Sequence, residues 1–166
     1  MKLTSSGIHD GIIDDRFGDK GMNFIGDMPS YSLPLKFEDA PAETKTFAVV
    51  IVDHDAIPVS GFSWIHWAVA NITKNELPEN AAREERYLNQ GTNSWSSPLL
   101  AEPLTRMQAA TYGGMTPPDR PHTYIIKAYA LDSTLTLNRG FYLNDLYAAM
   151  DGHILDKAVL TAIYNN

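Results

Sequence analysis

The chain has 166 residues, of which 44% are hydrophobic and 20% are charged, a composition typical of one globular domain rather than of a disordered protein. Its net charge of -7 argues against nucleic acid or an anionic membrane surface as the partner, because both select basic proteins. It contains no cysteine, which excludes disulfides, thiolate metal ligands and a cysteine nucleophile.

Residues 1–19 contain no continuous apolar segment of the kind found in signal peptides. No segment approaches the ~20 apolar residues that cross a bilayer as a helix. We therefore expect one domain over residues 1–166, located in the cytoplasm, without stable insertion into a membrane.

Extended segments dominate the first half of the chain. Residues 30–37 alternate between polar and apolar until Pro34, a pattern that suits an edge strand or an irregular one. Residues 45–52 are β-branched and almost continuously apolar, which is typical of a strand covered on both faces. After an interruption that contains Pro58 and Gly61, residues 63–72 predict the next strand.

The second half is less regular and changes its period near the end. Residues 73–121 are rich in Asn, Gly, Ser and Pro, and a loop of that length is expected to contain short strands or to carry function. Residues 122–131 predict the last strand. Apolar side chains then recur at helical spacing, first at Leu146, Met150 and Ile154 and then at Leu155, Val159 and Ile163. We expect a short helix and a longer one, separated near Gly152 and packed on a mainly β core.

Charged and imidazole side chains lie at the ends of these strands. Strand period places Trp64, His66 and Ala68 on one face, with Ile65, Trp67 and Val69 on the other. A short antiparallel connection brings the end of one strand beside the start of the next. Asp53, Asp55 and His66 are therefore expected to meet at one edge of a sheet. His122 and Tyr124 join them if their strand enters from that edge.

The segment "TYGGMTPPDRPHTY", residues 111–124, suggests the wall of a pocket. The pair Gly113–Gly114 permits close backbone approach and positive φ, and the pair Pro117–Pro118 stiffens the chain before His122. Two imidazoles and a phenol can donate hydrogen bonds to phosphate oxygens. Nearby aspartates would hold the imidazoles in the donating tautomer and raise their pKa values, or bind an amine on the same ligand. Taken singly, a strand histidine is more often a half-buried residue with one hydrogen bond, and Asp-x-Asp is more often a turn.

Three segments, "VDHDAIP", "FSWIHWAVANI" and "YGGMTPPDRPHTYIIKAYALD", in this order and spacing, resemble the phosphatidylethanolamine-binding protein family, more narrowly its bacterial Raf-kinase-inhibitor-like branch. The resemblance extends from about Arg16 to "GHILDKAVLTAIY". It implies a mainly β fold, an antiparallel Greek-key-like β-sandwich with a C-terminal helix, and a shallow anion pocket. The pocket positions that it implies here are Asp53, Asp55, Trp64, His66, Gly114, Pro117, His122 and Tyr124.

The chain also departs from the family pattern. His54 stands where the family usually has proline, and Ile57 displaces the second proline of that loop by one place. Thr123 replaces the arginine of the common His-Arg-Tyr, and Met115 and Thr116 replace smaller or proline-type residues.

Three functions remain open from the sequence. The first is binding of a small phosphate- or carboxylate-bearing ligand, such as a phospholipid head group, without catalysis, cofactor or metal; no serine lies in a nucleophile-elbow context. The second is metal-dependent hydrolysis, with Asp53, His66 and His122 as a two-histidine, one-carboxylate triad. The third is inhibition of a kinase or protease through the protein surface. A homodimer is compatible with the resemblance.

Overall fold

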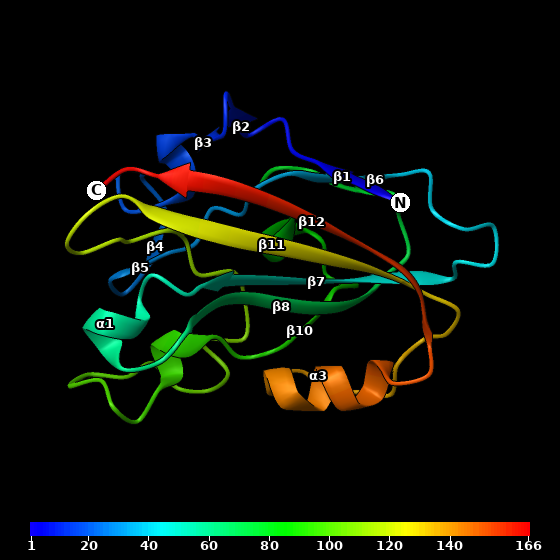
Figure 1. The fold of residues 1–166 in the computed structure, drawn as a ribbon. Coiled ribbons are helices and arrows are strands. Elements are labelled where there is room, and N and C mark those ends of the chain that lie inside the picture. Colours follow the sequence, from blue (N-terminus) through cyan, green and yellow to red (C-terminus); the bar gives the residue numbers. More distant parts are fainter.

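A curved sheet of seven strands forms the centre of the protein. The computed structural model describes all of residues 1–166. In spatial order the strands are β10 (Asn89–Gln90), β8 (Trp64–Ile72), β7 (Thr46–Asp53), β11 (His122–Leu131), β12 (Ile154–Tyr164), β3 (Ile12–Ile13) and β2 (Ile8–His9) (Figure 1). The pairing of β12 with β3 is parallel and every other pairing is antiparallel.

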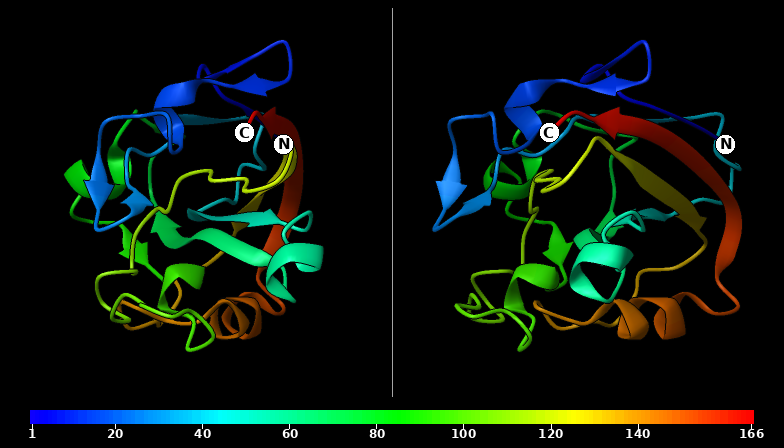
Figure 2. Two further views of the ribbon diagram at one scale, coloured as in Figure 1. Left: turned by 90° about the vertical axis from the view of Figure 1, so that its left-hand side faces the viewer. Right: turned by 60° about the vertical axis from the view of Figure 1, so that its left-hand side comes forward.

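A smaller sheet packs on one face of the main sheet and a helix packs on the other. The smaller sheet contains β1 (Lys2–Thr4), β6 (Leu35–Glu38) and β9 (Glu76–Leu77), and a separate pair is formed by β4 (Phe24–Ile25) and β5 (Met28–Pro29). The helical elements are η1 (Asp15–Phe17), α1 (Ile57–Ser60), α2 (Ala81–Glu84), η2 (Ser94–Ser96) and α3 (Leu143–Met150). Figure 2 shows α3, in orange, on the far side of the main sheet from the blue N-terminal strands. A core cluster of 24 residues lies between the two sheets, and a cluster of ten lies between the main sheet and α3. The mainly β, two-sheet prediction is confirmed.

Strand β7 shows why its sequence is almost continuously apolar. Phe47, Val49 and Ile51 belong to the core between the sheets. Ala48 and Val50, which alternate with them, belong to the core beneath α3. Both faces of the strand are therefore covered, as predicted. The other central strands also match their predicted positions, and residues 73–121 contain the expected short elements.

The prediction of a second C-terminal helix is wrong, because that segment forms a strand. Residues 143–150 form α3, but residues 154–164 form β12, which pairs with β11 from His122 to Leu131. Val159 and Ile163, which helical spacing placed on a buried stripe, are exposed, whereas Ala162 and Tyr164 are buried at strand spacing. Long-range pairing with β11 has overridden the local pattern. None of the helices is long and apolar enough to cross a membrane.

Candidate functional site

Three central strands bring side chains together at one edge of the main sheet. Asp53 is the last residue of β7, and it lies opposite Trp64 at the start of β8 and opposite Tyr124 near the start of β11. These three residues therefore form a row across three neighbouring strands. The sequence left open the edge from which β11 enters, and the pairing of Tyr124 with Asp53 shows that it is the edge at which β8 starts.

His66 lies at a β-bulge, which changes the direction of the side chains in β8. Ile51 pairs with Trp67 and Val52 pairs with Ile65, so the β8 residue between them has no partner on β7. As a consequence, Trp67 packs in the core between the sheets, whereas Ile65 packs against the core beneath α3. The simple alternation predicted for residues 64–69 is wrong at this point. A bulge of this kind re-aims a side chain, and here it coincides with the imidazole that faces the cavity.

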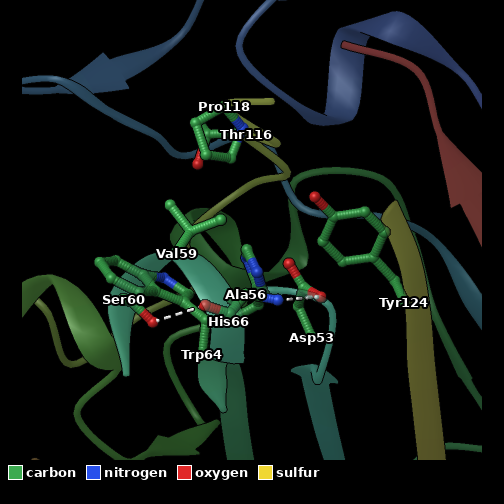
Figure 3. A pocket seen from close by; sticks show the side chains of 9 residues that line it. All are labelled: Asp53, Ala56, Val59, Ser60, Trp64, His66, Thr116, Pro118 and Tyr124. Carbon is green, nitrogen blue, oxygen red and sulfur yellow. Dashed lines mark hydrogen bonds between the residues drawn. The ribbon is translucent and has the colours of Figure 1, made fainter. Parts of the chain in front are cut away.

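A cavity of about 170 Å³ opens at this edge of the sheet, beside α1. Figure 3 shows the side chains gathered around it. They are Asp53, Ala56, Val59, Ser60, Trp64, His66, Thr116, Pro118 and Tyr124. Four of the eight predicted site residues therefore line the cavity. The other four, which are Asp55, Gly114, Pro117 and His122, do not.

The position of His66 fixes its tautomer. Its Nδ1 lies 2.9 Å from the carbonyl oxygen of Gly113 and 3.1 Å from that of Gly114, so Nδ1–H donates to both. In the neutral ring Nε2 is then a hydrogen-bond acceptor. Burial lowers the pKa of His66 to about 4, although the two carbonyls and the Asp53 charge act in the opposite direction. The ring is neutral at pH 7, and the raised pKa that the sequence predicted for this histidine is wrong.

The two glycines hold His66 because they pack closely against their neighbours. A Cβ at Gly113 would lie 2.5 Å from the Trp95 ring, and one at Gly114 would lie 2.5 Å from the carbonyl oxygen of Phe17. The Gly113 N–H also donates to the His66 carbonyl at 2.8 Å. The predicted close approach is confirmed, but neither glycine has a positive φ.

His122 has a different environment, because a carboxylate contacts each of its ring nitrogens. Nδ1 lies 2.7 Å from Asp53 Oδ2 and Nε2 lies 2.8 Å from Asp119 Oδ1. Carboxylates only accept hydrogen bonds, so both nitrogens donate and the ring is a cation. Burial lowers the pKa of His122, but the hydrogen bonds to Asp53 and Asp119 outweigh it and the net shift is upward. The predicted rise is confirmed here, in a ring with no nitrogen free for a ligand.

Asp55 connects the segment after β7 to the start of β11. Its carboxylate accepts from the Thr123 N–H at 2.9 Å and from Arg120 Nη2 at 3.0 Å. The Thr123 hydrogen bond, followed by that of Arg120, lowers the pKa of Asp55. Asp55 therefore stabilises the loop beside the cavity rather than facing the ligand space.

Sequence reasoning missed the side chains that the α1 region and the segment before β11 contribute to the cavity. They are Ala56, Val59, Ser60, Thr116 and Pro118. A signal for α1 was present, because Pro58 suits the first turn of a helix and Gly61, with φ of 86°, supplies the left-handed residue that ends it. Pro117 itself is buried, and its neighbours on both sides line the cavity.

Three polar atoms of the cavity lining have no hydrogen-bond partner. They are Trp64 Nε1, His66 Nε2 and the Tyr124 hydroxyl oxygen, and all three are buried. Burial, followed by the negative charge of Asp53, raises the pKa of Tyr124 well above its ordinary value, so the phenol keeps its proton and can donate. Buried polar atoms in proteins nearly always have partners. Three such exceptions gather around this one cavity, which makes it the candidate functional site.

Comparison with known proteins gives relatives along nearly the whole chain. The chain is 47% identical over 147 residues to the uncharacterized protein YxkA of Bacillus subtilis, covering 86% of this chain and 82% of the relative. It is 36% identical over 174 residues to YbhB of Escherichia coli, covering 99% and 100% of the two chains.

Solved structures show the same fold. The crystal structure of a putative phosphatidylethanolamine-binding protein homologue from Chlamydia trachomatis matches with a TM-score of 0.79 and 29% identity, over 99% of this chain and 97% of that one. YbcL of Escherichia coli, called a new member of the mammalian PEBP family, matches with a TM-score of 0.76 and 25% identity, over 99% and 98%. The family model named Phosphatidylethanolamine-binding protein matches residues 4–165. The chain therefore belongs to the phosphatidylethanolamine-binding protein family.

Proposed function

We propose that the chain binds a small phosphate- or carboxylate-bearing molecule, such as a phospholipid head group, in the cavity beside α1. The observation that carries this proposal is the set of three unpaired polar atoms on Trp64, His66 and Tyr124. A buried polar group without a partner costs about 1–3 kcal/mol. An oxyanion in the cavity would accept hydrogen bonds from the indole and the phenol and so remove that penalty.

We propose binding without a catalytic step. Each ligand in a metal triad needs a free lone pair, and both nitrogens of His122 donate to carboxylates instead. No group of three or more histidine, aspartate and glutamate side chains is arranged to hold a metal ion. The geometry therefore gives no support to the triad of Asp53, His66 and His122 as metal ligands.

The test is a titration of the protein with phosphoethanolamine and, separately, with inorganic phosphate, followed by NMR of the imidazole and indole groups. We expect saturable shifts of the Trp64 and His66 signals, and smaller shifts of His122, whose nitrogens keep their carboxylate partners. Tyr124→Phe should weaken binding about tenfold, the equivalent of one lost hydrogen bond of ~1.4 kcal/mol.

His153→Gln serves as the matched control, because His153 is exposed and bonds only to Asp132. It should leave the titration unchanged. The proposal is rejected if neither ligand moves the Trp64 or His66 signals at tens of millimolar.

The cytoplasmic location, a homodimer and inhibition of a kinase or protease stay predictions of the sequence. Cell fractionation tests the location, and sedimentation velocity tests the oligomeric state. Recovery of protein partners by the wild type and by Tyr124→Phe, which alters the cavity and keeps the fold, separates a surface role from a cavity role.

A further inference from the structure

The cavity presents two kinds of unused hydrogen-bonding capacity. Trp64 Nε1–H and the Tyr124 hydroxyl are donors without acceptors. His66 Nε2 is an acceptor without a donor, because the proton of this ring is on Nδ1. Asp53 accepts from the Ala56 N–H at 3.2 Å and from His122 Nδ1 at 2.7 Å, one bond on each carboxylate oxygen. Each of these oxygens has a second lone pair. A ligand that satisfies the site must both accept and donate.

The charge around the cavity also disfavours a fully deprotonated ligand. No lysine or arginine is among the residues that line it. The imidazolium of His122 is shared between Asp53 and Asp119, so this group of three carries a formal charge of one negative unit. Like charges at close range repel strongly where water is excluded. A dianion in the cavity would face the Asp53 carboxylate, whose neighbouring cation, the His122 imidazolium, is already shared between two carboxylates.

We infer that the cavity selects a phosphate group that carries one proton. Its single O–H donates to His66 Nε2 or to the Asp53 carboxylate, and its remaining oxygens accept from Trp64 and Tyr124. This inference rests on the proposed function and narrows the ligand to a phosphate monoester in one ionic form, because the phosphodiester of an intact phospholipid has no O–H to donate. A fully deprotonated oxyanion has only lone pairs to offer, so its oxygens would meet the acceptors of His66 and Asp53 directly.

The protein itself is a poor source of that proton. The groups around the His66 ring are Asp53 from β7, His122 and Tyr124 from β11, and the carbonyls of Gly113 and Gly114. The two carbonyls and Asp53 favour the protonated ring, but burial outweighs them and leaves the pKa of His66 at about 4. Phosphate monoesters, in contrast, have a second pKa of about 6, so a substantial share carries one proton near neutral pH.

Methyl phosphate and methyl sulfate test the inference. As monoanions they have the same charge and nearly the same shape, and they differ by one O–H. Calorimetric titration at pH 6 should show methyl phosphate binding at least about tenfold tighter, a difference of ~1.4 kcal/mol. At pH 8, where methyl phosphate becomes a dianion, its affinity should fall, while that of methyl sulfate stays level.

The outcomes separate the two proposals. Equal affinity for both monoanions at pH 6 would overturn the selection of a protonated phosphate and leave oxyanion binding in place. No binding of either monoanion, of phosphoethanolamine or of inorganic phosphate would overturn both. A ¹⁵N spectrum of the His66 ring supplies an independent measurement. We expect the ring to stay neutral with methyl phosphate bound, and conversion to imidazolium would also overturn the inference.

Two variants sharpen the comparison. Tyr124→Phe removes a donor that both ligands use, so both affinities should fall and their ratio should stay the same. Asp53→Asn replaces an acceptor with an amide that can donate, so the ratio should move toward one. If Asp53→Asn does not fold, the wild-type ratio and the His66 spectrum decide the question.

Discussion

The surroundings of two buried histidines, His66 and His122, differ more than their positions in the sheet suggest. Each lies at or near the start of a long strand, and the rings belong to neighbouring parts of one site. The His66 ring meets carbonyl oxygens on one nitrogen only, and burial keeps it neutral. The His122 ring meets a carboxylate on each nitrogen and is held as a cation.

This difference shows that the place of an imidazole in a strand does not decide what it can do. Burial dominates where the ring meets only carbonyls, and two carboxylates outweigh burial where they contact the ring. His66 keeps one nitrogen free and unpaired, which disfavours the empty folded state but leaves an acceptor for a ligand. His122 uses both nitrogens to connect the end of β7, through Asp53, to the loop before β11, through Asp119. One ring is available for binding and the other stabilises the wall beside it.

The largest expected effect tests the structural role of His122. His122→Phe keeps most of the side-chain volume but removes both N–H donors, so the buried Asp53 carboxylate loses its charged partner. Breaking a buried ion pair from one side costs about 3–5 kcal/mol. Urea denaturation at pH 7 should show a loss of free energy of unfolding in this range.

His153→Phe is the matched control for this measurement, since His153 forms a similar contact with Asp132 but on the exposed surface. It should change the free energy of unfolding by less than about 0.5 kcal/mol. Equal losses in the two variants would contradict the assigned difference between a buried and an exposed pair.

The pH dependence of stability distinguishes the two rings by the sign of their effects. The pKa of His66 is lowered from its ordinary value of 6.5 to about 4 in the folded state. Between those values the unfolded chain binds a proton that the folded chain does not, so stability falls as the pH falls, by about 3 kcal/mol in total. The pKa of His122 is raised, so its contribution is fully present below pH 6.5 and is lost as the pH rises through the folded value.

Stability is therefore expected to fall at low pH because of His66 (the acid limb) and at high pH because of His122 (the alkaline limb), and each limb can be removed by one substitution. Urea denaturation between pH 4 and pH 9 should show that His66→Phe loses the acid limb and keeps the alkaline one. His122→Phe should show the reverse. If both variants keep both limbs, other groups control the titration and the comparison of the two rings fails.

Strand ends and strand order allowed part of the site to be predicted from the sequence. The apolar run that ends at Asp53 and the short connection to Trp64 require these residues to lie near each other, and β-sheet pairing does place them opposite one another. The protonation of each imidazole was beyond prediction. It depends on which carbonyls or carboxylates lie within 3.1 Å of a nitrogen, and three of them, from Gly113, Gly114 and Asp53, are far from their histidine in sequence.

Errors of prediction arose where long-range pairing changes a local pattern. The bulge at His66 results from the relative register of β7 and β8, which neither strand specifies alone. In the same way, Leu155 and Val159 have helical spacing, but hydrogen bonding to β11 makes their segment a strand. Both cases follow from tertiary pairing overriding a local period.

The smallest expected effect on stability concerns Tyr124, which contrasts with His122 although both belong to β11. Its hydroxyl is buried without a partner, so Tyr124→Phe removes an unsatisfied group while the aromatic ring remains. The free energy of unfolding should stay unchanged or rise by up to about 1 kcal/mol. Anion affinity should fall in the same variant, because the phenol is one of the donors to the ligand. Thermal unfolding with and without phosphoethanolamine measures both effects, and a clearly destabilised Tyr124→Phe would show that the hydroxyl serves the fold rather than the ligand.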